Sequence, residues 1–178
     1  MDDDLWVFGY GSLMWRPGFP HEEAAPARLF GRHRALCVYS VVHRGTEERP
    51  GLVLGLDRGG SCRGIAFRVA PHNSESVIAY LRQRELVTSV YLESRLPIRL
   101  ENRDFTTVAM AFEVDRKHPQ YAGPLPRQRA LELVRDSVGE AGHNRDYVIN
   151  TADHLKQLGI HDPELAWLAE RLREQDAP

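Results

Sequence analysis

The first two thirds of the chain and the last third differ in the spacing of their hydrophobic residues. Before Pro124, short runs rich in β-branched and aromatic residues alternate with Gly, Pro, Asp and Asn, which is typical of β-strands joined by turns. One such separator is Arg58-Gly59-Gly60. Residues 16–33 contain three prolines and little periodicity, so no element is predicted there. The pattern predicts strands near residues 5–8, 34–42, 52–57, 62–69, 88–93, 95–100 and 106–114.

After Pro124, apolar residues recur at helical spacing and predict three helices. Their apolar faces carry Leu131, Val134 and Val138 in the first, Tyr147, Ile149, Leu155 and Leu158 in the second, and Leu165, Leu168 and Leu172 in the third. Strands followed by helices favour an α+β fold, which we expect to be a small mixed, largely antiparallel β-barrel with packed helices, including a helical C-terminal third. No linker, repeat or low-complexity stretch divides the sequence, so a single domain over residues 1–178 is expected.

One further helix is predicted inside the strand region, over residues 73–85. Asn73 and Ser74 are suitable N-cap residues, and Glu75 suits the first turn. The β-branched run at 87–90 indicates that the helix has ended by then. A helix of about three turns is therefore expected.

A carboxylate ends the apolar stripe of this helix. Ile78, Leu81 and Glu85 fall on one face at a period of 3.6 residues. Burial would raise the pKa of Glu85 toward neutrality, which a general acid/base needs. Another interpretation remains open, in which Glu85 lies exposed in a fraying last turn or pairs with Arg82 or Arg84. Those two arginines are expected on the solvated faces of the helix.

A loop with two glycines follows the first predicted strand, over residues 8–13, Phe-Gly-Tyr-Gly-Ser-Leu. Gly9 and Gly11 admit positive φ and close approach of a ligand, so the loop could aim several amide N–H groups at one point. Such a point would hold an anion or an oxyanion. From this segment alone, a simple turn between two strands remains an equal alternative.

Several other chemistries are disfavoured by the same loop. It lacks the glycine two residues after Ser12 that a nucleophile elbow needs, so a serine hydrolase is not expected. It also lacks the third glycine of a dinucleotide fingerprint and the lysine of a phosphate-binding P-loop. Nucleotide binding therefore loses its main support.

Several segments together match one known family. They are Trp6-Val7-Phe8-Gly9-Tyr10-Gly11-Ser12-Leu13-Met14-Trp15, His43-Arg44-Gly45 with Pro50-Gly51, Gly64-Ile65-Ala66-Phe67-Arg68, Tyr80-Leu81-Arg82-Gln83-Arg84-Glu85, His118-Pro119-Gln120-Tyr121, and Gly142-His143-Asn144-Arg145-Asp146-Tyr147. Through these segments the chain resembles the ChaC-type γ-glutamylcyclotransferases. The segments match the family in order and in approximate spacing, and together they cover nearly the whole chain. The resemblance implies the barrel fold of that family, with the loop and the helix-borne glutamate in one cavity.

The resemblance also implies a reaction and a site. Members of the family are carbon–nitrogen lyases that release 5-oxoproline and Cys-Gly from glutathione without a cofactor. By resemblance, Glu85 is the catalytic acid/base, and the substrate-binding residues are Phe8, Gly9, Tyr10, Gly11, Ser12, Leu13 and Tyr147. A tyrosine on an amphipathic helix is also a common core residue, and that alternative stays open for Tyr147. Other γ-glutamyl amino acids or amines as substrates, or a non-catalytic γ-glutamyl-binding regulatory module, are the competing interpretations.

The resemblance implies a small-molecule substrate, and the charge and the start of the sequence do not point to any other kind of partner. The net charge of −2 gives no reason to expect nucleic acid or an anionic membrane surface as a partner. The acidic start, residues 1–4, does not resemble a secretory signal, and no apolar run approaches the length of a membrane span, so a cytoplasmic location is expected. Arg44 and Arg49 are expected in a solvated loop.

The cysteines and histidines do not suggest a metal or redox centre. Cys37 and Cys62 are far apart in predicted strands and are expected to be small core residues of a reduced protein. The histidines form no His-Glu-x-x-His motif and no cluster with cysteine at metal-ligand spacing, so no metal is expected.

Overall fold

The computed structural model describes residues 4–174, and their contacts divide the chain into two compact units. The first unit combines the residues up to Arg34 with Gly55–His118, and the second combines Ala35–Leu54 with the residues from Pro119 onward. Each unit therefore draws on two separate stretches of sequence. The expectation of a single domain stays a prediction.

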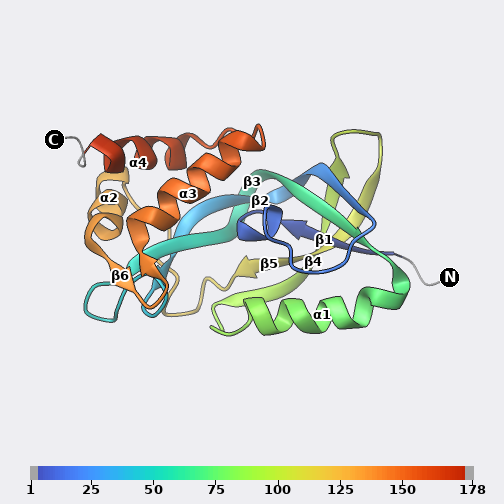
Figure 1. The fold of residues 1–178 in the computed structure, drawn as a ribbon, viewed down its shortest axis with the longest axis horizontal. Helices are drawn as coiled ribbons and strands as arrows, with labels where there is room; N and C mark the ends of the chain where they lie inside the picture. Colours follow the sequence, from blue (N-terminus) through green and yellow to red (C-terminus); the bar gives the residue numbers. More distant parts are fainter. Residues whose placement is uncertain (1–3, 175–178) are drawn as a thin grey trace. The chain divides into compact units, whose positions relative to one another are not determined.

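The first unit contains a closed five-stranded barrel with the strand order β1-β3-β2-β4-β5 (Figure 1). The strands are β1 (Leu5–Gly9), β2 (Glu23–Ser40), β3 (Gly51–Val69), β4 (Tyr91–Leu100) and β5 (Thr106–Val114). β1 is antiparallel to β3, and β4 is antiparallel to both β2 and β5. β1 closes the barrel by pairing with β5 in parallel, through Val7 and Met110. The predicted mixed, largely antiparallel barrel is confirmed.

Alternation along the strands fills the barrel interior. Side chains two residues apart point to the same face of a strand, so every second residue enters the core. The interior combines the two aromatic residues of β1 with smaller residues of the other four strands: Trp6, Phe8, Ala25, Ala27, Leu29, Leu56, Cys62, Ala66, Ile98, Leu100, Ala109 and Ala111. Side chains of different size complement each other in this way and fill the interior of a small barrel.

Helix α1 (Pro71–Glu85) packs on the outer side of the barrel, along which it lies as the green helix of Figure 1. Its buried residues Val77 and Leu81 join a second apolar cluster with Met110 and Phe112 of β5. The predicted C-terminal end of this helix is confirmed, but its predicted start is wrong. Ala70 is the N-cap, and Pro71 occupies the first turn, where its missing N–H costs nothing.

Three strand predictions need correction. β2 begins at Glu23, inside the stretch where no element was expected. Arg58-Gly59-Gly60 does not separate two strands, because β3 continues through both glycines, which take left-handed φ of 100° and 65°. The strands expected at 88–93 and 95–100 form the single strand β4.

The second unit contains the helices of the C-terminal third, the end of β2 (residues 35–40) and the start of β3 (residues 51–54). Its elements are α2 (Arg127–Asp136), the short pair β6 (Val138–Gly139) and β7 (Gly142–His143), α3 (Asn144–Gln157) and α4 (Pro163–Glu174). The three predicted helices are confirmed, and α3 and α4 lie against each other in Figure 1. The prediction that Val138 lies on the apolar face of the first of these helices is wrong. α2 ends at Asp136, and Val138 lies exposed in β6.

Side chains of α3 hydrogen-bond the start of β3 within this unit. The amide of Asn144, which is fully buried, accepts from the Leu52 N–H and donates to the Leu52 carbonyl, each at 2.8 Å. One helical turn later, the Tyr147 hydroxyl accepts from the Leu54 N–H at 3.0 Å. The two helix residues are thereby paired with alternate residues of one strand, which satisfies backbone groups that would otherwise be buried without partners.

The structure also places the two cysteines. Cys37 and Cys62 are both buried, as expected of small core residues, and no disulfide joins them within residues 4–174. Among the helices of residues 4–174, none is both long enough and apolar enough to cross a membrane.

Candidate active site

The glycine loop leaves the barrel at the end of β1 and passes into a short 3-10 helix, η1 (Ser12–Met14). The Met14 N–H donates to the Gly11 carbonyl at 2.9 Å, which closes the turn. Within residues 4–174, the amide N–H groups of Gly11, Ser12 and Leu13 have no recorded hydrogen-bond acceptor. The first N–H groups of a helical turn lack internal partners, so this loop has donors to offer a ligand.

The reason given for the two glycines is only half right. Gly11 has φ of −134°, and Gly9 is not among the glycines with positive φ, so the predicted positive φ at these positions is wrong. The close approach of a ligand stays a prediction, but Gly9 does make a close approach within the chain. A Cβ built there would lie 3.1 Å from the Leu13 Cβ, tighter than ordinary packing allows. Gly9 thus lets the loop fold back tightly on the end of β1.

The side chains of the loop divide between the core and the surface. Phe8 and Leu13 are buried in the apolar clusters on either side of β1. Tyr10 is half-buried against the barrel core, and its carbonyl accepts from the Arg34 guanidinium at 2.6 Å. Ser12 is exposed, and its hydroxyl is available to partners outside the loop. Phe8 and Leu13 therefore shape the loop from beneath, while Ser12 and the backbone face outward.

Glu85 is the last residue of α1, and its side chain is 22% exposed. The stripe predicted to end in this carboxylate is present, with Leu81 buried and Ile78 half-buried beside it. Burial raises the pKa of Glu85, and the positive charge of Arg84 offsets part of that rise. The predicted direction of the pKa shift is therefore confirmed, and so is the alternative that Glu85 pairs with Arg84, at 3.2 Å.

Arg84 was expected in water, and this expectation is wrong. Its guanidinium contacts the Ser12 hydroxyl at 3.0 Å through Nη2 and the Glu85 carboxylate at 3.2 Å through Nε. Ser12 and Arg84 are 72 positions apart in the sequence. The glycine loop and Glu85 nevertheless contact the same guanidinium group. The structure thus brings together the two elements that the sequence singles out.

Tyr147 lies in the second unit, on the first turn of α3. Its ring lies 5.5 Å from the Arg44 guanidinium, which also donates to the His143 carbonyl at 3.1 Å. Arg44 is therefore half-buried against an aromatic ring, which corrects its expected place in a solvated loop, whereas Arg49 is exposed as expected. Tyr147 has a structural contact in its own unit, through Leu54, and its role in substrate binding stays a prediction.

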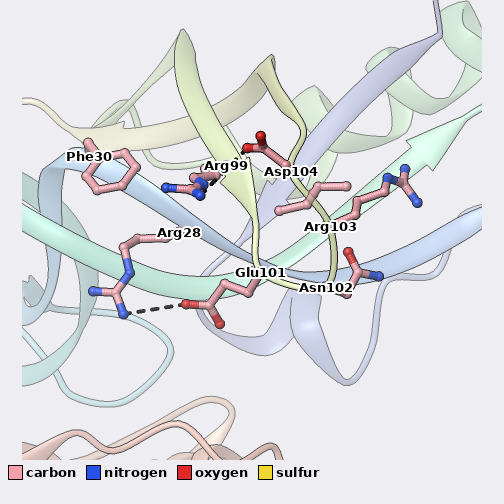
Figure 2. A pocket seen from close by; sticks show the side chains of 8 residues that line it. Arg28, Phe30, Arg99, Glu101, Asn102, Arg103 and Asp104 are labelled. Atoms are coloured by element: carbon pink, nitrogen blue, oxygen red, sulfur yellow. Dashed lines mark hydrogen bonds and ion pairs between the residues drawn. The ribbon is translucent and has the colours of Figure 1, made fainter.

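A well-formed hollow elsewhere in the first unit does not coincide with this site. It has a volume of about 480 Å³ and lies where β2 passes the β4–β5 hairpin (Figure 2). Figure 2 shows Arg28 reaching Glu101 and Arg99 reaching Asp104, at 3.4 and 3.6 Å. Its arginines are thus paired with neighbouring carboxylates, and its lining includes neither Glu85 nor any residue of the glycine loop.

Comparison with known proteins gives a consistent result. The family model described as "ChaC-like protein" matches residues 5–175. A glutathione-specific γ-glutamylcyclotransferase of Escherichia coli (strain K12) is 34% identical over 90% of this chain and 69% of its own length. The glutathione-specific γ-glutamylcyclotransferase 1 of Homo sapiens is 30% identical over 87% of this chain and 71% of its own length.

A solved structure supports the fold. The crystal structure of a γ-glutamyl cyclotransferase specific to glutathione from yeast superposes with a TM-score of 0.83, at 20% identity, over 96% of each chain. This likeness concerns the fold alone. The barrel, the helical C-terminal third and the sequence matches together define a γ-glutamylcyclotransferase-like protein. This chain belongs to the ChaC-like family.

Proposed function

We propose that this protein is a glutathione-specific γ-glutamylcyclotransferase, an enzyme that cleaves glutathione to 5-oxoproline and Cys-Gly. The observation that carries the proposal is the contact of Glu85 and Ser12 with one guanidinium. It sets a carboxyl group of raised pKa beside a loop whose amides at Gly11, Ser12 and Leu13 have no recorded acceptor within residues 4–174. Perturbed carboxylates of this kind cluster at functional sites. The names of the curated relatives support glutathione as the substrate.

The reaction needs no nucleophile from the protein. The α-amine of the γ-glutamyl group attacks its own γ-carbonyl carbon, which closes a five-membered lactam and breaks the bond to the cysteine nitrogen. Intramolecular attack by a well-oriented group has an effective molarity of about 10⁵ M or more. The main task of the site is therefore to hold the substrate in a folded conformation.

Glu85 handles the protons in this proposal. Its carboxylate accepts a proton from the α-ammonium, which frees the amine for attack, and returns a proton to the cysteine nitrogen as the carbon–nitrogen bond breaks. The α-nitrogen loses a second proton as it becomes the lactam N–H, and the amine of free Cys-Gly takes up a second proton, so two protons pass between the same two nitrogens and none is gained or lost overall. A raised pKa makes the return step easier, since the protonated form persists closer to neutral pH.

The glycine loop handles the negative charge. The amides of Gly11, Ser12 and Leu13 have N–H groups to donate, either to the carbonyl oxygen as it becomes an oxyanion or to the α-carboxylate. Because the loop is already folded against β1, these donors need little reorganisation during the reaction. We keep Phe8, Gly9, Tyr10 and Tyr147 in the substrate-binding set as part of the same proposal.

Incubation of the purified protein with glutathione tests the activity. Mass spectrometry is expected to detect 5-oxoproline and Cys-Gly in equal amounts. A parallel panel of γ-glutamyl amino acids and amines separates this proposal from a cyclotransferase of wider specificity. Binding of glutathione without any 5-oxoproline after long incubation would instead favour a non-catalytic binding module.

The setting of the enzyme is part of the proposal. We infer a cytoplasmic enzyme with a small-molecule substrate and without nucleic acid or membrane as a partner. Glutathione as the proposed substrate supports this location.

A further inference from the structure

The Arg84 guanidinium contacts two segments through all three of its nitrogens: the glycine loop with the chain that follows it, and the end of α1. Nη1 donates to the carbonyls of Arg16 and Pro17 at 2.7 and 3.1 Å and lies 3.1 Å from the Tyr80 hydroxyl. Nη2 donates to Ser12, and Nε faces Glu85. A planar guanidinium can serve several acceptors at fixed angles, and a lysine ammonium cannot reproduce that geometry.

These contacts hold the chain that follows the glycine loop on the last turn of α1. Pro17 is followed by Gly18, which has φ of 73° and a backbone so close to Tyr80 that a Cβ would lie 2.3 Å from the tyrosine hydroxyl. Tyr80 and Arg84 are one helical turn apart, so both side chains reach the same turn of backbone. Residues 12–18 are thus fitted to the helix end by polar contacts and close packing together.

Arg84 also acts on Glu85 through its charge. The C-terminal end of α1 has a partial negative charge, which opposes ionisation of a carboxyl group placed there. Burial further opposes the ionisation of Glu85. Among residues 4–174, the Arg84 cation is the charged group recorded as favouring that ionisation. The Tyr80 hydroxyl accepts a hydrogen bond from Arg84, and none is recorded between Tyr80 and Glu85 in the described part of the chain. The two roles of Arg84, geometric and electrostatic, are therefore separable by substitution.

We propose that Arg84 is the positioning residue of the active site, which fixes the glycine loop and the Glu85 carboxylate in one frame. The inference rests on the proposed function for its kinetic readout, but its structural readout is independent of any activity. A purely scaffolding arginine would not influence the ionisation of Glu85, and a purely electrostatic one would not hold residues 12–18.

The kinetic test compares Arg84→Lys with Arg84→Met. Both variants lose the fork, and we expect kcat/KM for glutathione to fall about 10- to 100-fold in each, as for the loss of hydrogen bonds to a charged group. Arg84→Met also loses the cation, so the acidic limb of its kcat/KM profile moves to higher pH, while Arg84→Lys keeps the limb of the wild type. Unchanged kcat/KM in Arg84→Lys, or an unmoved limb in Arg84→Met, would overturn the proposal.

A matched control is available on the same helix. Arg82 pairs with Glu93 on β4 and does not contact the loop. Arg82→Lys and Arg82→Met are expected to keep the kinetic constants and the pH profile of the wild type. An equal loss in the Arg82 variants would assign the effect to helix stability and would overturn the positioning role.

Amide hydrogen exchange provides the readout that does not depend on catalysis. The Arg16 N–H donates to the Ser12 carbonyl at 2.8 Å, inside the segment that Arg84 holds, and the Leu86 N–H donates to the Arg82 carbonyl at the helix end. In Arg84→Lys, exchange at Arg16 is expected to accelerate at least 10-fold while exchange at Leu86 is unchanged. Equal protection of Arg16 in both proteins would overturn the proposal, whereas an inactive wild type would defeat only the proposed function.

Discussion

Glu85 on α1 and Glu113 on β5 are two partly buried glutamates of the same unit with opposite pKa shifts. Glu113 is the less exposed of the two, at 13% against 22% for the side chain of Glu85. Burial alone would raise the pKa of both. For Glu113, hydrogen bonds from Arg32 and Ser94, with the charges of Arg32 and Arg58, outweigh burial and lower the pKa. For Glu85, burial outweighs the charge of Arg84 and raises it.

The difference lies in the hydrogen bonds that reach each carboxylate. Ser94 donates to Glu113 at 2.6 Å and Arg32 occupies its other oxygen, so both oxygens are committed. Glu85 has the Arg84 ion pair but no recorded hydrogen bond from the described part of the chain. A carboxylate that is buried and fully bonded is a structural anchor, and one that is buried and incompletely bonded can exchange a proton with a ligand.

Replacement of Glu85 by glutamine should have the largest effect. Glu85→Gln keeps the shape of the side chain and removes its ability to accept a proton, so kcat on glutathione is expected to fall about 10²- to 10⁴-fold. Steady-state kinetics with quantified 5-oxoproline measure this. Glu75→Gln, which changes an exposed glutamate nearer the start of the same helix, is the matched control. Near-normal turnover in Glu85→Gln would remove the acid/base role.

Replacement of Glu113 should affect stability more than catalysis. Glu113→Gln keeps an acceptor for Ser94 but leaves Arg32 without its charged partner, and the free energy of unfolding at pH 7 is expected to fall by about 1–3 kcal/mol. Because the folded protein lowers the pKa of Glu113, this stabilisation is present above the unfolded value, near 4.3, and is lost as the pH falls through the folded value. Denaturant titrations of both proteins should therefore converge in acid, and a constant difference down to pH 2 would contradict the assignment.

The smallest expected effect is on the stability of Glu85→Gln itself. Since folding raises the pKa of Glu85, its contribution to stability is fully present below the unfolded value and declines as the pH rises toward the folded value. At neutral pH an ionised carboxylate at this position destabilises the folded state. The glutamine variant is therefore expected to be slightly more stable than the wild type, with a free energy of unfolding higher by roughly 0.5 kcal/mol. A clear loss of stability would show that the ionised Glu85 is held as firmly as Glu113.

Features set by local sequence were predicted well. The end of α1, its apolar stripe and the place of Glu85 follow from a few neighbouring residues at helical spacing. The strands whose β-branched and aromatic residues alternate, such as β1 and β5, were found for the same reason. The barrel class followed from the order of strands and helices, and the family resemblance supported it.

Features that depend on distant partners were missed. The first half of β2 places Ala25, Ala27 and Leu29 in the barrel core, and this alternation was present in the sequence, but alanine has a low strand propensity and prolines surround it. Arg84 was missed because its acceptors, at Ser12 and in residues 16–17, are supplied by a segment about 70 positions earlier. The pair Tyr80 and Arg84, one helical turn apart, was the available signal.

The hydrogen bonds between Leu52 and Asn144 cannot form until well after Leu52 has been synthesised. The two residues are separated by 92 positions, so the strand start is synthesised long before the amide that satisfies it. At translation rates of 5–20 residues per second, the wait is roughly 5 to 20 seconds. During that interval the backbone groups of Leu52 bond water in place of Asn144, and the apolar side chains around it are not yet buried by the native fold. Chaperones and other nascent chains engage exposed apolar segments of this kind.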